Sequence, residues 1–459
     1  MPPRIPKVAI SVASHGCPCR FAGRNLSTAA SATLEAAPPA PPPTGLAQLT
    51  HRRLLSLYGP DSTHYLQGIT TANVRPGLTS GFYSAFLSAQ GRVLNDVFIY
   101  PSSHSPAFAA ALPDSVVAKY GAPSPDTPAY IIEVDAAEAD RLLKHLKRYK
   151  LRAKLDIRLL NPEAWSLWSV WDEQSPWTPH ASPALDAPEP DLLPGRPDTI
   201  GTHDARAPGM GRRLVLPATA SLDALLQRGV PRAPLAAYTI RRMLRGVPEG
   251  QAEVPREAAL PLEANLDFMA GVDFRKGCYV GQELTIRTHH TGVVRKRVLP
   301  ALLYSAAAAA AASSSPASGA DAAHVLPPRE LHYDPAAPAL AAVAPHGADI
   351  MPARARRGRS AGKWLAGVGN IGLALCRVEM MTDLVLTAEG SRWSADDAFK
   401  LTVPSAAAGA EGDESGGGGA SRAARETVQT AGGEEVLVRA FVPDWVRNQV
   451  KVKKPNARV

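Results

Sequence analysis

The chain has 459 residues, of which 45% are hydrophobic, and its formal net charge is +8. This length is too great for one hydrophobic core and predicts two or three domains, while the absence of an apolar run of about 18 residues argues against a membrane-spanning helix. The first 44 residues hold four of the basic residues and one acid, so the rest of the chain carries only about +5. A charge that small is weak evidence for nucleic acid and suits an acidic protein partner equally well, and a basic solvated surface is the favoured interpretation. We expect no DNA binding and a monomer when the protein is free.

The N-terminal leader has the composition of a mitochondrial transit peptide. Residues 1–34 contain four basic residues, no acid and many Ser, Thr and Ala. Such segments are rich in Arg and Ser and poor in acids. A Pro-rich spacer, APPAPPPTG at 37–45, follows and should be extended. We expect residues 1–44 to be leader and spacer, with a disordered tail as the alternative, and a location in the mitochondrial matrix.

Strands and helices follow one another in the first half of the folded part. Asp61 or Ser62 is the expected N-cap of the first helix, and Ala89-Gln90-Gly91 is the expected turn of a hairpin. The expected elements are a strand, turn and helix in 47–70, two strands in 81–100, a strand at 130–135, an amphipathic helix in 136–157 and a strand at 164–171. The apolar face of the second helix would hold Leu142, Leu143, Leu146 and Tyr149. Because these elements lack a strict βαβ rhythm, they indicate an α+β fold.

The C-terminal part is expected to form a β-barrel. Residues 363–381 alternate small and apolar side chains, and residues 434–445 read as a strand. Three polar or low-complexity segments, 173–199, 305–323 and 405–433, are expected as loop insertions, and the tail from residue 447 is basic. The expected domains are 45–300, an α+β region of two subdomains, and 301–459, the barrel.

Four cysteines are present, and none forms a CxxC pair. Cys17 and Cys19 lie in the leader, and Cys278 and Cys376 are nearly a hundred residues apart. A disulfide framework is therefore not expected, nor is a self-contained zinc or iron–sulfur site, which needs about four ligands. If Cys278 binds a metal, it should share that metal with another molecule.

The segment KGCYVGQELTIRTHH, residues 276–290, has the residue types of a reactive site. Gly277 and Gly281 flank Cys278 and would expose its thiol. Lys276, Arg275 and Arg287 lie near in sequence, and positive neighbours lower a thiol pKa. His289 and His290 could extend a metal site, but on a strand they would point to opposite faces, so at most one would face the cysteine. A nucleophile, a metal ligand and a small buried residue all stay open for Cys278. No recognised catalytic or nucleotide-binding motif accompanies it.

The octapeptide KGCYVGQE resembles the K-G-C-[FY]-x-G-Q-E signature of the YgfZ-type proteins, which share the fold of the glycine-cleavage aminomethyltransferase, the T-protein. The flanking segments ELTIRTHHTGVVRKR and LPLEANLDFMAGVDF look most like the mitochondrial branch of that family. Four further segments support the resemblance: YLQGITTANV, FLSAQGRVLNDVFIY, RRMLRGVPEG and VGNIGLALCRVE. The resemblance spans about residues 46–380.

This resemblance implies a T-protein-like α+β fold with a C-terminal β-barrel. It also implies an assembly factor that acts late in making [4Fe–4S] clusters together with A-type iron–sulfur carrier proteins, without a clear enzymatic activity. Cys278 would be a shared or transient ligand of the cluster, and Lys276 its basic partner.

The alternative that the resemblance leaves open is a one-carbon transferase that binds tetrahydrofolate. The residues that would face such a cofactor are Asp96, Tyr279, Gln282, Glu283 and Arg287. Two departures weaken it. Leu244 stands where the T-protein pattern R-L-E-A-G has the carboxylate that grips the pterin, and Asn95-Asp96 replaces an acidic pair. A leucine cannot accept the pterin's hydrogen bonds, which makes aminomethyl transfer doubtful.

Overall fold

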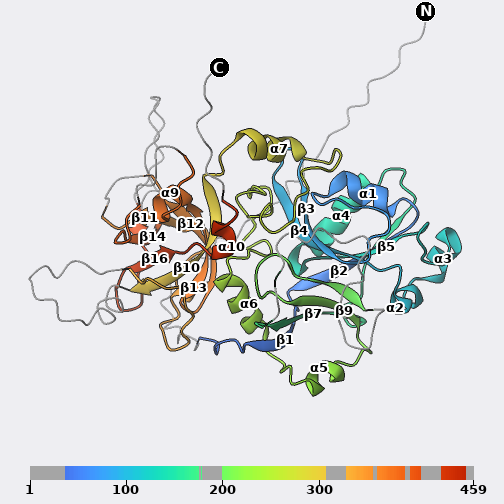
Figure 1. Ribbon diagram of the computed structural model, residues 1–459, viewed down its shortest axis with the longest axis horizontal. Helices are drawn as coiled ribbons and strands as arrows, with labels where there is room; N and C mark the ends of the chain where they lie inside the picture. The colour runs from blue at the N-terminus through green and yellow to red at the C-terminus, as the bar shows by residue number, and fades with distance from the viewer. Residues whose placement is uncertain are drawn as a thin grey trace, which may run out of the picture. The chain divides into compact units, whose positions relative to one another are not determined.

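The computed structural model describes residues 37–174, 177, 199–305, 327–354, 359–387, 393–404 and 425–450 (Figure 1). The expected transit peptide lies outside the described residues, as do most of the three expected insertions and of the basic tail. None of the helices within those ranges is long and apolar enough to cross a membrane.

A five-stranded antiparallel sheet holds most of the elements expected in the first half of the chain. Its order is β3-β4-β5-β2-β6. The strands are β2 (Arg52–Tyr58), β3 (Phe82–Leu87), β4 (Val93–Pro101), β5 (Ala129–Asp135) and β6 (Asp156–Leu159). The expected hairpin is confirmed, because β3 and β4 pair on either side of residues 88–92.

Helices α1 (Ser62–Ile69) and α4 (Ala139–Tyr149) supply an apolar layer to this sheet. Asp61 is the N-cap of α1, but its carboxylate accepts from the backbone N–H of Lys154 at 2.6 Å rather than from the helix. Helix α4 is shorter than expected, since it ends at Tyr149, and the last two residues of the predicted segment belong to β6. The short helices α2 (Pro106–Ala110) and α3 (Asp114–Tyr120) lie between β4 and β5 in the chain.

A four-stranded antiparallel sheet, β1-β7-β9-β8, is the second layer. It contains β1 (Thr44–Gln48), β7 (Trp165–Asp172), β8 (Ile200–His203) and β9 (Arg212–Pro217), and α5 (Asp223–Gln227) follows it. Helix α6 (Leu235–Leu244) contacts β1 of this sheet and also β12 and β13 of the barrel described next. It therefore joins the two regions.

The expected C-terminal barrel is confirmed. Six antiparallel strands pair in the order β11-β12-β13-β10-β16-β14, and the pairing of β11 with β14 closes the ring. The strands are β10 (Lys296–Ser305), β11 (Asp349–Pro352), β12 (Gly362–Val368), β13 (Ile371–Arg377), β14 (Phe399–Pro404) and β16 (Val436–Ala440). Strand β15 (Arg425–Thr427) pairs on the outside of β14, and α9 (Val378–Met381) and α10 (Asp444–Arg447) are single turns. The first barrel strand begins at Lys296, slightly before the expected boundary at 300.

Candidate functional site

The signature cysteine lies in an exposed turn that precedes α7 (Gln282–Thr291). Gly277 is also exposed, whereas the next residue along, Tyr279, is buried. Cys376, the other cysteine in the described part of the chain, is buried in β13, and burial raises the pKa of its thiol. Of these two thiols, Cys278 is the one that another molecule can reach.

The ammonium group of Lys276 lies at the C-terminal end of α1. Its Nζ atom donates to the carbonyl oxygens of Gln67 at 2.8 Å, Thr70 at 2.7 Å and Ala72 at 2.7 Å. A helix leaves its last carbonyls unpaired and partly negative, so a cation fits there. Burial lowers the pKa of Lys276 to about 7, while three acceptors match the three N–H donors of the charged form. Lys276 therefore fastens the turn to α1. Its role as the basic partner of the thiol stays a prediction.

A close backbone contact holds the other side of the turn. Gly281 has φ +79°, and a Cβ atom on it would lie 2.2 Å from the carbonyl oxygen of Ser88 in the β3–β4 hairpin. Gly91 of the same hairpin has φ +77°, and its Cβ would lie 2.9 Å from the carbonyl oxygen of Gly281. The side chain of Gln282 accepts from the backbone N–H of Tyr279 at 3.2 Å. Glycine and glutamine of the signature thus shape the turn on which the thiol sits.

The residues after the signature form a helix, not the strand assumed for the two histidines. Glu283 and Arg287 are exposed and one helical turn apart on α7. The ring of His289 stacks on Phe274 with centroids 3.6 Å apart, and the ring of His290 lies 5.1 Å from that of His289. Both histidines are in the last turn of α7, about 10 Å along the helix from its start beside the cysteine turn. The strand argument about their faces was therefore wrong.

In the part of the chain that the structure describes, no self-contained metal site accompanies the thiol. Within the ranges that the structure describes, no three His, Cys, Asp or Glu side chains are grouped so that they could hold a metal ion. Iron–sulfur clusters are held mostly by four cysteine thiolates. Any cluster that reaches Cys278 would thus keep most of its ligands on another molecule.

Asp96 lies on β4, away from the exposed surface. Its side chain is fully buried, accepting from Arg52 Nη1 at 3.3 Å and from the backbone N–H of Gly250 at 3.1 Å. The neighbouring Asn95 accepts from Arg256 Nη1 at 2.9 Å. The structure brings Tyr279, Gln282, Glu283 and Arg287 to one turn and helix, but it places Asp96 in a separate, buried environment.

This environment is a network of buried ions that the sequence did not predict. Glu133 accepts from Arg52 Nε at 2.8 Å and also pairs with Arg213. Glu249 pairs with Arg213 and accepts from Arg206 Nη1 at 2.9 Å. The members are Arg52, Asp96, Glu133, Asp204, Arg206, Arg213 and Glu249. The one signal in the sequence was a charge inside an apolar strand, such as Glu133 in YIIEVD.

The charges of the network compensate one another. Burial alone would raise the pKa of Glu249, but Arg213 and Arg206 hold that pKa well below its usual range. The same balance lowers the pKa of Glu133, against its burial, through Arg213 and Arg52. His51, on the margin of the network, lies 2.8 Å from Glu249 through its Nε2 atom. Three guanidinium groups face four carboxylates here, so the network leaves no unpaired buried cation for an anionic ligand.

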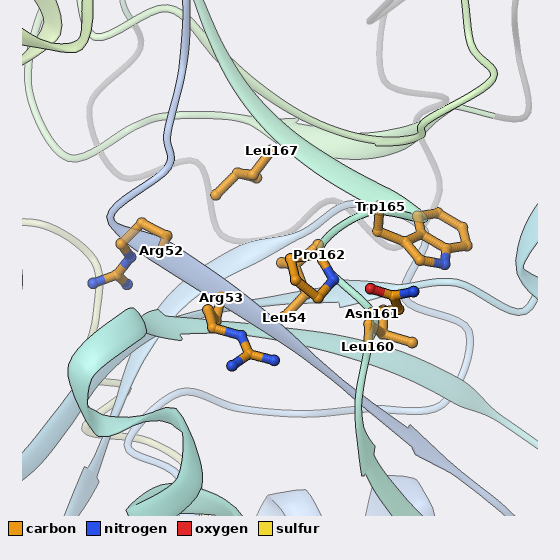
Figure 2. Close-up of a pocket in the computed structure, with 8 residues that line it drawn as sticks. All are labelled: Arg52, Arg53, Leu54, Leu160, Asn161, Pro162, Trp165 and Leu167. Atoms are coloured by element: carbon orange, nitrogen blue, oxygen red, sulfur yellow. The ribbon is translucent and has the colours of Figure 1, made fainter.

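The residues around Asp96 do not fit a pterin. A cleft beside the network, lined by Arg52, Arg53 and Trp165, has a volume of about 30 Å³, enough for about two waters (Figure 2). Figure 2 shows Arg52 and Arg53 leaving β2 in different directions, as neighbours on a strand do. A larger groove of about 390 Å³ lies by Trp168 and Arg232, and Asp96 lines neither space. Leu244, at the place of the pterin-gripping carboxylate, packs against an apolar cluster of the barrel.

Comparison with known proteins gives three kinds of relative. The family described as "CAF17, C-terminal beta-barrel domain" matches residues 295–407. A protein of Aspergillus clavatus is 42% identical over 94% of this chain and 89% of its own length. One of Aspergillus fumigatus is 44% identical over 90% and 84%, and one of Coccidioides immitis is 41% identical over 98% and 93%. Each of the three is named "Iron-sulfur cluster assembly factor IBA57 homolog, mitochondrial".

A solved structure extends the likeness in fold. The glycine cleavage system aminomethyltransferase T of Bartonella henselae matches with a TM-score of 0.51 at 13% identity, over 90% of this chain and 88% of that one. The expected T-protein-like α+β fold with its C-terminal barrel is therefore confirmed.

Proposed function

The chain belongs to the family of mitochondrial iron–sulfur cluster assembly factors named IBA57 homologues, and on this premise we propose that it helps to form or transfer late [4Fe–4S] clusters in the mitochondrial matrix. The observation that carries the proposal is the exposed thiol of Cys278 on a turn fixed from two sides. The cluster is the cargo of this process rather than a resident cofactor.

Cys278 supplies one ligand to a cluster that a partner still holds. The thiol gives its proton to water, and an Fe–S bond to Cys278 forms. A partner thiolate leaves the same iron and takes up a proton, so the cluster charge and the number of electrons stay unchanged. Partners of the A-type carrier class suit this exchange because their own cysteines would hold the remaining irons.

A thiol on a fixed turn is better suited to ligand exchange than a thiol on a mobile segment. Three carbonyl acceptors on Lys276 and the contact of Gly281 with the hairpin hold the backbone on either side of Cys278. A ligand held in place before the exchange loses less conformational entropy when the Fe–S bond forms. Glu283 and Arg287, exposed on α7, are then available to contact the partner.

The test is anaerobic reconstitution of the full chain with an A-type carrier and its cluster, followed by visible absorption and electron paramagnetic resonance spectroscopy. Cys278→Ser should remove the signal of the shared cluster, and Cys278→Ala should not rescue [4Fe–4S] enzymes in cells that lack the native protein. The double variant Cys17→Ser, Cys19→Ser is the matched control, since it removes the two leader thiols and should leave the signal intact. A cluster signal that is the same in wild type and Cys278→Ser would show that the thiol is not a ligand.

The tetrahydrofolate-dependent transferase is not favoured by this geometry. Asp96, the surviving carboxylate, already accepts from Arg52 and Gly250 and has no exposed surface. Titration calorimetry with tetrahydrofolate separates the two functions, and saturable heat at high ligand concentration would revive the transferase.

A further inference from the structure

The end of helix α4 exposes a leucine in a strained conformation. Leu151 is 89% exposed and has φ +47°. It follows Lys150, the C-cap of α4, at the position where helices often end with a left-handed residue, usually glycine. A leucine there costs backbone energy and buries no apolar surface in return. This cost is offset if the side chain enters an apolar environment outside the protein.

Positive charge surrounds this leucine. Between residues 141 and 155 the chain has no acid and seven basic residues: Arg141, Lys144, Lys147, Arg148, Lys150, Arg152 and Lys154. Arg141 lies 3.7 Å from Glu138, but among the described residues none of the other six forms an ion pair. The nearest acids have other partners or lie apart: Asp156 pairs with Arg158, Asp61 accepts from the backbone N–H of Lys154, and Asp140 lies at the other end of the helix. We call residues 144–154 the α4 tip.

The α4 tip is carried on a rigid support. Leu142 and Leu146 are fully buried against the five-stranded sheet, and the hydroxyl of Tyr65 on α1 donates to the carbonyl oxygen of Leu146 at 2.6 Å. Tyr149, 36% exposed, lies beside His145 with ring centroids 4.6 Å apart. Leu151 and Tyr149, two positions apart in sequence, are thus both held outward.

We infer that the α4 tip docks on the surface of an anionic lipid bilayer, with Leu151 and Tyr149 entering the headgroup region and the lysines and arginines facing lipid phosphates. A bilayer admits an apolar side chain at any point of its plane, whereas a protein partner would need a pocket matched to one protruding leucine. Basic residues with apolar or aromatic neighbours are the pattern of reversible binding to anionic membranes. The inference rests on α4 alone and stands whether or not Cys278 binds a cluster.

The test is co-sedimentation of the full chain with vesicles of phosphatidylcholine alone or with phosphatidylglycerol added. Wild type should bind the anionic vesicles more tightly, and high salt should weaken this binding. Lys147→Gln should lower the partition coefficient about five-fold, because each basic residue near the surface contributes about that factor. Leu151→Gly should lower it about ten-fold while the melting temperature stays equal or rises, because glycine accepts the left-handed conformation. This separates a loss of binding from a loss of folding.

Lys119→Gln is the matched control, since it removes one exposed lysine from α3 and should leave the partition coefficient unchanged. Because all variants keep the basic leader, its contribution to vesicle binding is the same in each, and their differences report on the α4 tip. Equal binding of wild type, Lys147→Gln and Leu151→Gly would overturn the inference. The inference would also be overturned if the protein did not bind vesicles but bound polyglutamate in a manner that depends on Lys147. The α4 tip would then dock an acidic protein.

Discussion

At the scale of single residues, Lys276 connects the reactive turn to the fold. Its ammonium group donates to three carbonyl oxygens at and just after the end of α1, of which that of Ala72 also accepts from the hydroxyl of Thr70. The sequence places this lysine two positions from the thiol, so a direct effect on the thiol was the natural hypothesis. Sequence distance does not say where a long side chain ends, and here the chain folds back toward residues some two hundred positions away.

The lowered pKa of Lys276 predicts how the free energy of unfolding depends on pH. Its pKa is lowered by burial to about 7, against about 10.4 for an exposed lysine. Between these values the unfolded chain holds a proton that the folded chain lacks, so the contribution of Lys276 to the free energy of unfolding rises with pH. The difference in this free energy between wild type and Lys276→Met should grow above about pH 7, by up to about 1.4 kcal/mol per pH unit. Urea unfolding across neutral and mildly alkaline pH measures it.

The exposed Lys119 supplies the control, because Lys119→Met should show no such slope. A constant difference between wild type and Lys276→Met over the same range would contradict the prediction. It would mean that the three carbonyl acceptors keep Lys276 charged in spite of its burial.

At the scale of elements, the start of α7 depends on the β3–β4 hairpin. Gly281→Ala places a methyl group 2.2 Å from the carbonyl oxygen of Ser88 and keeps a left-handed residue at φ +79°. We expect it to lower the free energy of unfolding by at least about 2 kcal/mol, from the backbone strain and the displacement of the hairpin. Chemical denaturation measures the loss, and the rate of Cys278 alkylation reports whether the turn has moved.

The signature itself contains the matched control. A Cβ atom on Gly277 would have no neighbour within 4 Å, and the φ of this residue is not positive. Gly277→Ala should therefore change the free energy of unfolding by no more than about 0.5 kcal/mol. If the two substitutions cost the same, the contact between Gly281 and the hairpin does not support the turn.

Local chemistry explains which elements the sequence predicted well. The turn at Ala89-Gln90-Gly91 and the alternating barrel strands are determined by residues close to one another in sequence. Both are present in the structure. Helix α7 was missed because its sequence, rich in threonine and histidine, has a weak preference for helix. Its first turn is set by Gly281 against the hairpin, a contact between segments nearly two hundred residues apart. The sequence identified the residues of the site, but the directions in which their side chains point depend on such tertiary contacts.

At the scale of the whole molecule, the buried ion network joins segments that are distant in the chain. Its members come from β2, β4, β5 and β9 and from the loops after β8 and α6. The pairs that form between these segments could not be predicted from one sequence, because each carboxylate could pair with any of many arginines. The family resemblance predicted the fold around the network, but it led us to expect Asp96 as a ligand residue rather than as one partner among buried ions.

The network also determines how the protein responds to acid, and Glu249 tests this. Arg213 and Arg206 hold its pKa well below the usual range, against its burial. A carboxyl whose folded pKa is depressed stabilises the fold above its unfolded pKa, about 4.3, and loses that contribution as pH falls toward the folded value. Glu249→Gln should therefore cost about 3–5 kcal/mol near neutral pH, because it leaves buried guanidinium groups without their counter-charge, and it should flatten the loss of stability below about pH 4.

Urea unfolding at several pH values measures both effects, with the exposed Glu163→Gln as a control that should match wild type. If the Glu249→Gln variant is as stable as wild type at neutral pH, the ion pairs of the network only offset the free-energy cost of burying their charges and do not hold the distant segments together.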